Sequence, residues 1–148
     1  MSGEHLFTAS VTWDATERSG ALASGSGFLS TTFGGAPSLG GRVDRTNPEE
    51  LLLGALLACF VQTWAIFLTK LRLPIESPRV DGTLELGADP AGGYRVTRVD
   101  LSAHVPAALL AEREADVLKT LALAEKYCIV SKAVRGGALR IHVAPLAA

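Results

Sequence analysis

Two cysteines are the residues of this 148-residue sequence best suited to carry chemistry. Cys59 stands in the apolar stretch "LLACFV", and Cys128 follows 69 residues later in "AEKYCIVSKAV". Together they could form a redox pair, because a thiolate attacks an oxidant and a second thiol then closes a disulfide. Each could equally be a small buried hydrophobe, as many free cysteines are. The residues alone leave both interpretations open.

The surroundings of each cysteine bear on whether it can react. A reactive thiolate needs a nearby positive group or a helix N-terminus. Cys59 lies eleven residues into a predicted helix, so we expect no helix N-terminus beside it, and an arginine or histidine must come from elsewhere. Helical spacing puts Cys128 on the core side of its helix, whereas its neighbours in "EKYC" and "SK" indicate an exposed edge.

Glu49 is the acidic residue whose spacing to Cys59 is of interest. In the first turn of a helix, a carboxylate is ordinarily there to complement the helix dipole. Glu49 and Cys59 are ten residues apart, which is about 15 Å along a helix. If both serve one site, the same helix cannot bring them together. The partner residue must then come from a second copy of the chain.

The first half of the chain contains strands and one long helix. Residues 5–13 and 21–33 are predicted strands, followed by the glycine-rich segment 34–45. A helix is predicted from Pro48 to about Leu71, with Asn47 as its N-cap.

The second half adds a hairpin and an amphipathic helix. Strands are predicted over 76–87 and 92–105, a helix over 106–128, and a last strand over 138–146. This order predicts an α+β fold, with helices on one face of a mostly antiparallel sheet. We expect one domain over residues 1–148.

Composition and motifs exclude several classes of function. The net charge of −1 attracts neither nucleic acid nor anionic lipid. No Cys-x-x-Cys or His-Glu-x-x-His occurs, and the histidines (His5, His104 and His142) form no metal motif, so we expect no metal and no cofactor. The glycine-rich segment lacks the lysine of a phosphate loop, and no G-x-S-x-G precedes a helix.

Residues 51–68 are 18 residues without a charge, which is at the threshold for a membrane span. Gln62 and Thr63 interrupt the apolar run, and a helix that is apolar all round can also lie at the centre of a domain or a dimer. A single membrane span is therefore the less favoured alternative. No basic region leads into an apolar one at the N-terminus, so we expect no signal peptide and a cytoplasmic location.

Two motifs carry a family resemblance. The segment "TNPEELLLGALLACF" (46–60), followed by "AEKYCIVSKAV" (124–134), resembles the OsmC/Ohr family of osmotically inducible and organic hydroperoxide resistance proteins. The resemblance includes the ten-residue spacing from Glu49 to Cys59. It implies an intertwined homodimer, in which the sheets wrap two long central helices, one from each chain. Residues 51–68 would then be apolar because they pack inside the dimer.

The resemblance also implies site residues. Cys59 resembles the peroxidatic cysteine and Cys128 the resolving cysteine, while Glu49 resembles the carboxylate that orients a catalytic arginine. Relatives place this arginine in the N-terminal strands or in the loop before the helix. We favour Arg42 and Arg45 in that loop over Arg18, and the segment 34–45 resembles a less characterised, OsmC-like branch.

The leading hypothesis is therefore a thiol-dependent peroxidase of the oxidative stress response. We expect it to prefer organic hydroperoxides over hydrogen peroxide, because Leu56, Phe60 and Trp64 would make the pocket around Cys59 apolar. A dithiol, such as a lipoyl protein, would restore the cysteines, as it does for relatives. The alternative is a non-catalytic OsmC-like dimer that binds a hydrophobic small molecule.

Overall fold

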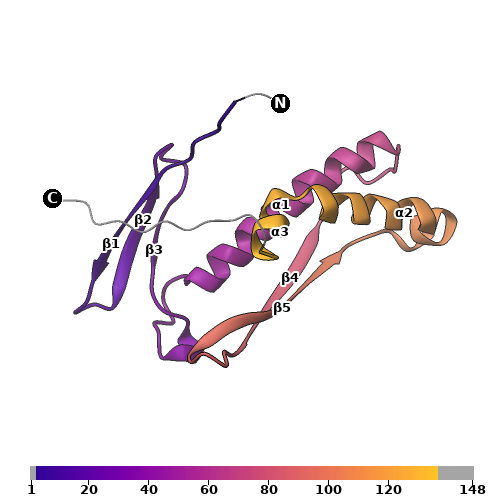
Figure 1. Cartoon of the computed structure of the whole chain (residues 1–148). Coiled ribbons are helices and arrows are strands. Elements are labelled where there is room, and N and C mark those ends of the chain that lie inside the picture. Colours follow the sequence, from indigo (N-terminus) through magenta and orange to yellow (C-terminus); the bar gives the residue numbers. More distant parts are fainter. Residues whose placement is uncertain (1–2, 137–148) are drawn as a thin grey trace. The chain divides into compact units, whose positions relative to one another are not determined.

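The structure, a computed structural model, describes residues 3–136 (Figure 1). The described chain contains both strands and long helices, as the predicted α+β class requires. Its contacts divide it into two compact units, Met1–Leu52 and Leu53–Ala148, which we call unit 1 and unit 2. The strand predicted over 138–146 lies outside the described residues, and the single domain over 1–148 stays a prediction.

Unit 1 contains a three-stranded antiparallel sheet. Its strands, in the order β1-β2-β3, are β1 (Ala9–Asp14), β2 (Ser19–Ser24) and β3 (Ser30–Phe33). The single strand predicted over 21–33 is wrong, because the chain reverses between Ser24 and Leu29, whose backbone N–H and C=O are joined at 2.9 Å. Gly27 in this turn has a φ of 76°, a conformation that glycine adopts without steric cost.

The rest of unit 1 leads into the long helix. After the short 3-10 helix η1 (Pro37–Leu39), Thr46 forms an isolated parallel bridge with Phe33. The helix α1 (Pro48–Lys70) then begins as predicted. Asn47 caps it, since Asn47 Oδ1 accepts a hydrogen bond from the backbone N–H of Glu50 at 2.9 Å.

The carboxyl end of α1 is held by an arginine from the next helix, α2 (Ala107–Tyr127). Arg113 donates to the carbonyl oxygens of Leu71 and Arg72, both at 3.1 Å, and pairs with Asp116 at 2.8 Å. These carbonyls would otherwise lack a partner beyond the last helical turn. The backbone of Arg113 is itself non-helical, with φ −134° and ψ 39°, and kinks α2.

The predicted hairpin of unit 2 is formed by β4 (Val80–Ala88) and β5 (Tyr94–Ala103). Arg98 pairs with Glu85 and Val96 pairs with Leu86, so Thr97 is an extra residue in β5. Such a bulge shifts the alternation of side chains by one position. It therefore explains how Val96 and the odd-numbered residues of β5 can serve the same apolar face.

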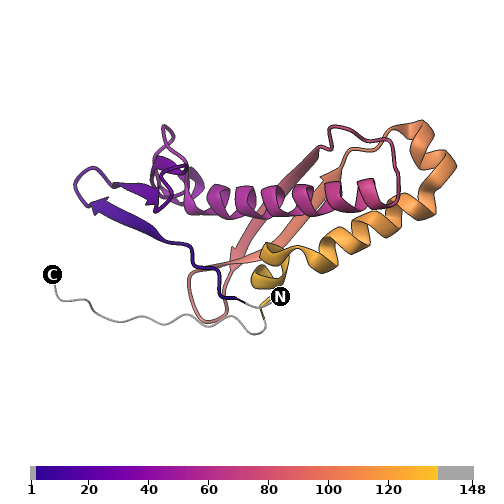
Figure 2. The ribbon, with the colours of Figure 1, turned by 90° about the horizontal axis from the view of Figure 1, so that it is seen from above.

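The helix predicted over 106–128 is confirmed as α2, which ends at Tyr127, and a short helix, α3 (Ile129–Val134), follows after a break at Cys128. In unit 2, α1 and α2 lie on the same face of the β4–β5 hairpin (Figures 1 and 2). Between them lies the core, whose side chains are less than a tenth exposed. Its members are Leu56, Phe60, Trp64, Leu68, Leu73, Leu109, Val117, Ala124 and Cys128.

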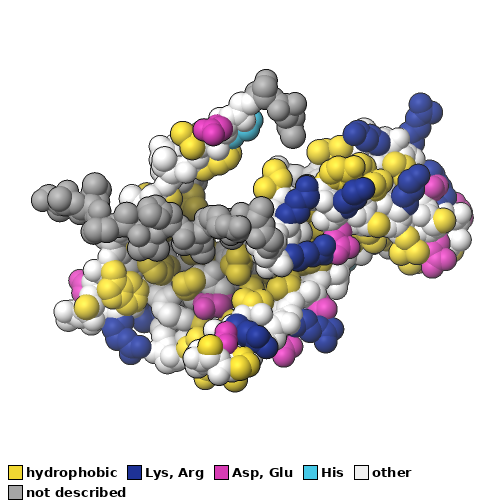
Figure 3. All heavy atoms as spheres, viewed as in Figure 1, with side chains coloured by type: hydrophobic (Ala, Val, Ile, Leu, Met, Phe, Trp, Pro, Cys, Tyr) yellow, Lys and Arg dark blue, Asp and Glu magenta, His cyan; other side chains and the backbone are white. Residues whose placement is uncertain are grey.

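Much apolar surface stays uncovered in the described residues. The helix α1 is long and apolar enough to cross a membrane by length and composition, a test that core helices of soluble proteins also pass. Only 22% of its most apolar window is buried among the described residues, so most of this apolar helix is at least partly exposed. Figure 3 shows hydrophobic side chains at the surface of this face of the molecule, and Ile66 on α1 is 53% exposed.

Candidate functional site

The structure brings Cys59 and Cys128 together in unit 2. Both are free thiols; Cys59, on α1, is partly buried and Cys128 is fully buried. The Cys128 thiol lies near the Cys59 sulfur and helps to lower its pKa, but the two cysteines form no disulfide. The predicted core-side position of Cys128 is confirmed, and the exposed edge predicted from its polar neighbours is wrong.

Cys128 occupies the junction between two helices. Its backbone is extended, with φ −64° and ψ 115°. Its N–H donates to Ala124 O at 2.9 Å and so ends α2, while its carbonyl accepts from Lys132 N at 3.2 Å and so starts α3. Its Sγ accepts a hydrogen bond from the N–H of Ser131 at 3.4 Å, as an N-cap does. The first backbone N–H groups of α3 are thereby left without partners inside the helix.

These free N–H groups change the acidity of Cys59. Burial raises the pKa of the Cys59 thiol, but hydrogen bonds from the N–H of Val130, from the Cys128 thiol and from the N–H of Ile129 lower it. The net result is a pKa below the ordinary value for cysteine. The expectation that no helix N-terminus lies near Cys59 is therefore wrong, because α3 begins beside it. Backbone donors have no side-chain signature, so no residue type could have indicated them.

The lowered pKa predicts how the reactivity of Cys59 depends on pH. A lower pKa keeps the thiol deprotonated at pH values where an ordinary cysteine is protonated, and only the thiolate is alkylated. The rate of Cys59 alkylation by iodoacetamide should therefore fall, as pH decreases, at a lower midpoint than for the same residue in urea-unfolded chain. Peptide mapping by mass spectrometry measures both midpoints. A folded midpoint at or above the unfolded one would contradict the hydrogen-bonded thiolate.

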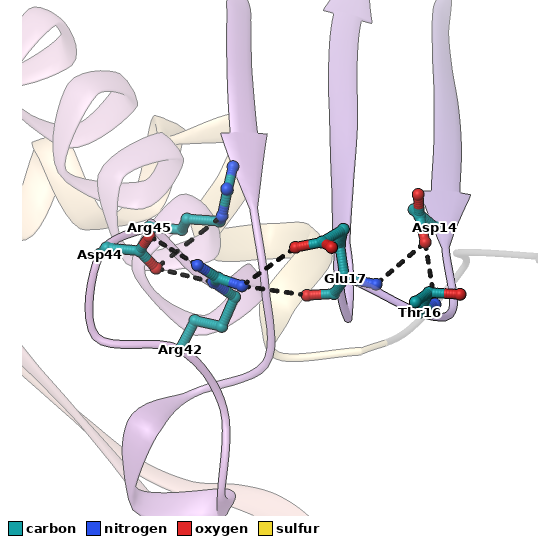
Figure 4. A network of polar contacts seen from close by, with 6 residues as sticks. All are labelled: Asp14, Thr16, Glu17, Arg42, Asp44 and Arg45. Atoms are coloured by element: carbon teal, nitrogen blue, oxygen red, sulfur yellow. Dashed lines mark hydrogen bonds and ion pairs between the residues drawn. The ribbon is translucent and has the colours of Figure 1, made fainter.

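Arg42 is engaged in an ion-pair network of unit 1 (Figure 4). Its guanidinium binds both oxygens of Asp44 at 2.9 Å, and its Nη1 lies 3.7 Å from Glu17 Oε2. The hydrogen bonds from Arg42 lower the pKa of the Asp44 carboxyl to about 2. A guanidinium held in this way by two carboxylates has few donors left for a further anion.

Arg45 and Glu49 differ from Arg42 in having unsatisfied buried atoms. Within residues 3–136, Arg45 Nε and Glu49 Oε2 are buried without a hydrogen-bond partner. Arg45 is 3.8 Å from Asp44 at its closest approach, and Arg18 donates to Gly40 O at 3.1 Å. Buried polar atoms of this kind ordinarily have partners. Of the three predicted arginines, Arg45 is therefore the one with a buried donor that makes no hydrogen bond within the described residues.

The predicted site residues fall into two groups. Arg42, Arg45 and Glu49 belong to unit 1, and Cys59 and Cys128 belong to unit 2. The structure defines the geometry of each group within its own unit.

A cavity of about 630 Å³ lies in unit 2 between α1, β5, α2 and α3. Its apolar wall includes Leu56, Phe60, Val96, Val99, Leu101 and Leu121, with Arg98 and Arg135 among its polar side chains. Leu56 and Phe60 were predicted to line an apolar pocket around Cys59. However, neither cysteine lines this cavity, and Trp64 is fully buried.

Residues 3–136 contain no group of three or more His, Cys, Asp or Glu side chains that could hold a metal ion. His104 hydrogen-bonds Asp81 at 2.6 Å on the polar face of the hairpin. His142 lies outside the described residues.

Comparison with known proteins identifies the class to which this fold and this cysteine pair belong. Residues 40–143 match the OsmC-like protein family, so the chain belongs to that family. The resemblance seen in the two cysteine motifs is thereby confirmed. A curated relative is organic hydroperoxide resistance protein-like 2 of Staphylococcus epidermidis, which is 30% identical over 92 residues. The match covers 62% of this chain and 61% of that protein.

Solved structures extend the similarity over most of the chain. An organic hydroperoxide resistance protein, OsmC, of Legionella pneumophila has a TM-score of 0.74 and 27% identity, over 91% of this chain and 93% of its own. An organic hydroperoxide resistance protein of Elizabethkingia anophelis has a TM-score of 0.74 and 25% identity, over 92% of each chain. The OsmC-like fold is thus confirmed.

Proposed function

We propose that this protein is a thiol-dependent peroxidase that reduces organic hydroperoxides. The observation that carries the proposal is Cys59, a cysteine of lowered pKa with a second free thiol, Cys128, beside it in unit 2. Membership of the OsmC-like family, and relatives named for organic hydroperoxide resistance, support a peroxide-related role.

The first step is attack of the Cys59 thiolate on one oxygen of the hydroperoxide. The O–O bond breaks, the sulfur is oxidised to a sulfenic acid, and the released alkoxide takes a proton and leaves as the alcohol. Hydrogen bonds from Ile129 and Val130 stabilise the thiolate that starts this step. They also leave it less basic, so that a larger fraction of Cys59 is thiolate at a given pH than of an ordinary cysteine.

The second step resolves the sulfenic acid. The Cys128 thiol gives up its proton and attacks the Cys59 sulfur, water leaves, and a disulfide forms. The position of Cys128 beside Cys59 supports this role. A dithiol reductant, such as a lipoyl group on a partner protein, then exchanges with the disulfide and restores both thiols.

An arginine and Glu49 complete the proposed site. Arg45 is the better candidate for contact with the thiolate, because its Nε makes no hydrogen bond whereas Arg42 donates two to Asp44. Glu49, with its own unpaired oxygen, would orient the guanidinium. Because Glu49 and Cys59 are ten residues apart in sequence, we propose that a homodimer brings Arg45 and Glu49 of one chain to Cys59 of the other. The exposed apolar surface of α1 supports such a partner.

The test is to count free thiols before and after one equivalent of cumene hydroperoxide. Both Cys59 and Cys128 should disappear together, with one intramolecular disulfide seen by mass spectrometry, because each oxidising equivalent consumes both thiols. Reduced protein treated with cumyl alcohol serves as the control. If both thiols survive, the two cysteines are core packing and the peroxidase proposal is wrong.

The cavity of unit 2 favours the alternative function. Its volume of about 630 Å³ suits a small molecule, and its wall is mostly apolar with Arg98, Glu125 and Arg135 as charged side chains. A protein that only binds such a molecule would leave Cys59 and Cys128 reduced in the thiol count. It would also bind the molecule equally well after Cys59 is replaced.

A further inference from the structure

A buried hydrogen bond joins the two helices that carry the cysteine pair. The indole Nε1–H of Trp64, on α1, donates to Thr120 Oγ1, on α2, at 3.0 Å. The Thr120 hydroxyl in turn donates to the carbonyl oxygen of Val117 at 2.7 Å. Both side chains are 0% exposed. Because the single hydroxyl proton is already given to Val117, the oxygen faces Trp64 as an acceptor only.

This bond makes one alignment of the two helices preferable to others. It is the one side-chain hydrogen bond between residues within the described α1 and α2 themselves, whereas Arg113 of α2 bonds the carbonyls of Leu71 and Arg72 just beyond the end of α1. If α2 slid or turned on α1, the indole N–H and the hydroxyl would remain buried with their mutual bond broken, which is unfavourable. Apolar packing alone has no such directional preference.

Thr120 is on the same helix face as Cys128. Thr120, Ala124 and Cys128 recur every four residues, and all three are 0% exposed. Thr120 is eight residues, or about 12 Å, from Cys128, and Trp64 is five residues, or about 7.5 Å, from Cys59. In Figure 2, α1 and α2 run in opposite directions, so both intervals lead from the Trp64–Thr120 bond toward the cysteines.

The closure of a disulfide depends closely on helix alignment. The two Cα atoms must come within about 4.4–6.8 Å, a window about 2.4 Å wide. A slide of one residue along α1, about 1.5 Å, would use more than half of that window. The alignment of α2 on α1 thus decides whether Cys128 can reach an oxidised Cys59.

We propose that Trp64 and Thr120 are positioning residues that set the rate at which Cys128 captures the oxidised Cys59 sulfur. They act on the resolving step, in which Cys59 sulfenic acid and the Cys128 thiol give a disulfide and water. They do not act on the attack on peroxide, because neither touches the Cys59 sulfur in the interactions that lower its pKa. The inference rests on the proposed function.

Four variants of the full chain test this role: Thr120→Val, Thr120→Ser, Trp64→Phe and Thr69→Val. Valine keeps the shape of threonine without its hydroxyl, and serine keeps the hydroxyl. Trp64→Phe removes the indole donor, and the Thr120 hydroxyl keeps its bond to the carbonyl of Val117. Because it leaves no hydroxyl unpaired, this variant still tests the role if Thr120→Val fails to fold. Thr69 is the matched control, because its hydroxyl bonds only Ala65 O of its own helix, at 3.0 Å.

The readout separates the two steps by acid quenching, alkylation and mass spectrometry after addition of cumene hydroperoxide. In Thr120→Val and Trp64→Phe, loss of the Cys59 thiol should stay within about twofold of the unmodified protein, while disulfide formation slows about tenfold or more. With excess peroxide, sulfinic acid should then accumulate on Cys59. Thr120→Ser and Thr69→Val should behave like the unmodified protein.

Disulfide formation at an unchanged rate in folded Thr120→Val or Trp64→Phe would overturn the positioning role. Equal slowing in Thr120→Ser or Thr69→Val would also overturn it, because the hydroxyl between the helices would then not be the cause. Diamide oxidation distinguishes this failure from failure of the proposed function. If the unmodified protein does not react with peroxide, the peroxidase proposal is wrong. The rates at which diamide closes the disulfide in the same variants still decide the role of Trp64 and Thr120.

Discussion

Replacing Cys59 with serine should abolish the consumption of cumene hydroperoxide. A serine hydroxyl is not ionised at neutral pH, and no hydrogen bond from α3 can make it a nucleophile comparable to a thiolate. We expect the rate to fall by about a thousandfold or more, as when the nucleophile of a covalent catalyst is removed. A colorimetric assay of remaining peroxide, with a dithiol as reductant, measures the rate.

The Cys59→Ser variant also needs evidence that it is folded. Serine is close to cysteine in size, and Cys59 is only partly buried, so the thermal midpoint should change little. Light scattering should give twice the 15.5 kDa of one chain for both proteins, since we propose a homodimer. A folded variant that still consumes peroxide would remove Cys59 from the mechanism. Loss of peroxide consumption together with unchanged binding of a hydrophobic ligand would show that the cavity of unit 2 binds the ligand independently of Cys59.

Replacing Cys128 with serine should have the second largest effect, and a different one. Cys59 should still react with the first equivalent of peroxide, because a serine hydroxyl can donate to the thiolate as the Cys128 thiol does. No intramolecular disulfide can form, so the sulfenic acid persists and excess peroxide converts it to sulfinic acid. We expect turnover with a dithiol to fall at least about tenfold and to stop after a few cycles. Steady-state kinetics and mass spectrometry of Cys59 measure both effects.

Cys128→Ala is the matched control for this prediction. Alanine removes the hydrogen bond to Cys59 as well as the resolving thiol, and the pKa of Cys59 should rise as a result. Its first reaction with peroxide at neutral pH should therefore be slower than that of Cys128→Ser. If Cys128→Ser instead turns over at the unmodified rate without overoxidation, Cys128 is a buried core residue and the reductant acts on Cys59 directly.

Local features of the fold could be predicted because their causes are local. The start of α1 follows from Asn47, whose side chain caps the next turn, and from Pro48 in the first helical position. The β4–β5 hairpin follows from two alternating segments around a glycine-rich turn. The single strand predicted over 21–33 failed although Gly25 and Gly27 lie in the reversal, because glycine also occurs inside strands without reversing the chain. The kink of α2 at Arg113 has neither glycine nor proline beside it to mark it.

In the candidate site too, local features could be predicted and contacts between distant segments could not. The identity of Cys59 and Cys128, their spacing and their likeness to a family could be recognised in the sequence, because side-chain chemistry and motif order are properties of the chain itself. Only the tertiary structure decided which groups act on Cys59. The N–H groups of Ile129 and Val130 become available where a helix starts, and they lower the pKa of a thiol only when folding packs that start against α1. The contact spans about 70 residues of chain, and its donors are backbone atoms that every residue but proline possesses.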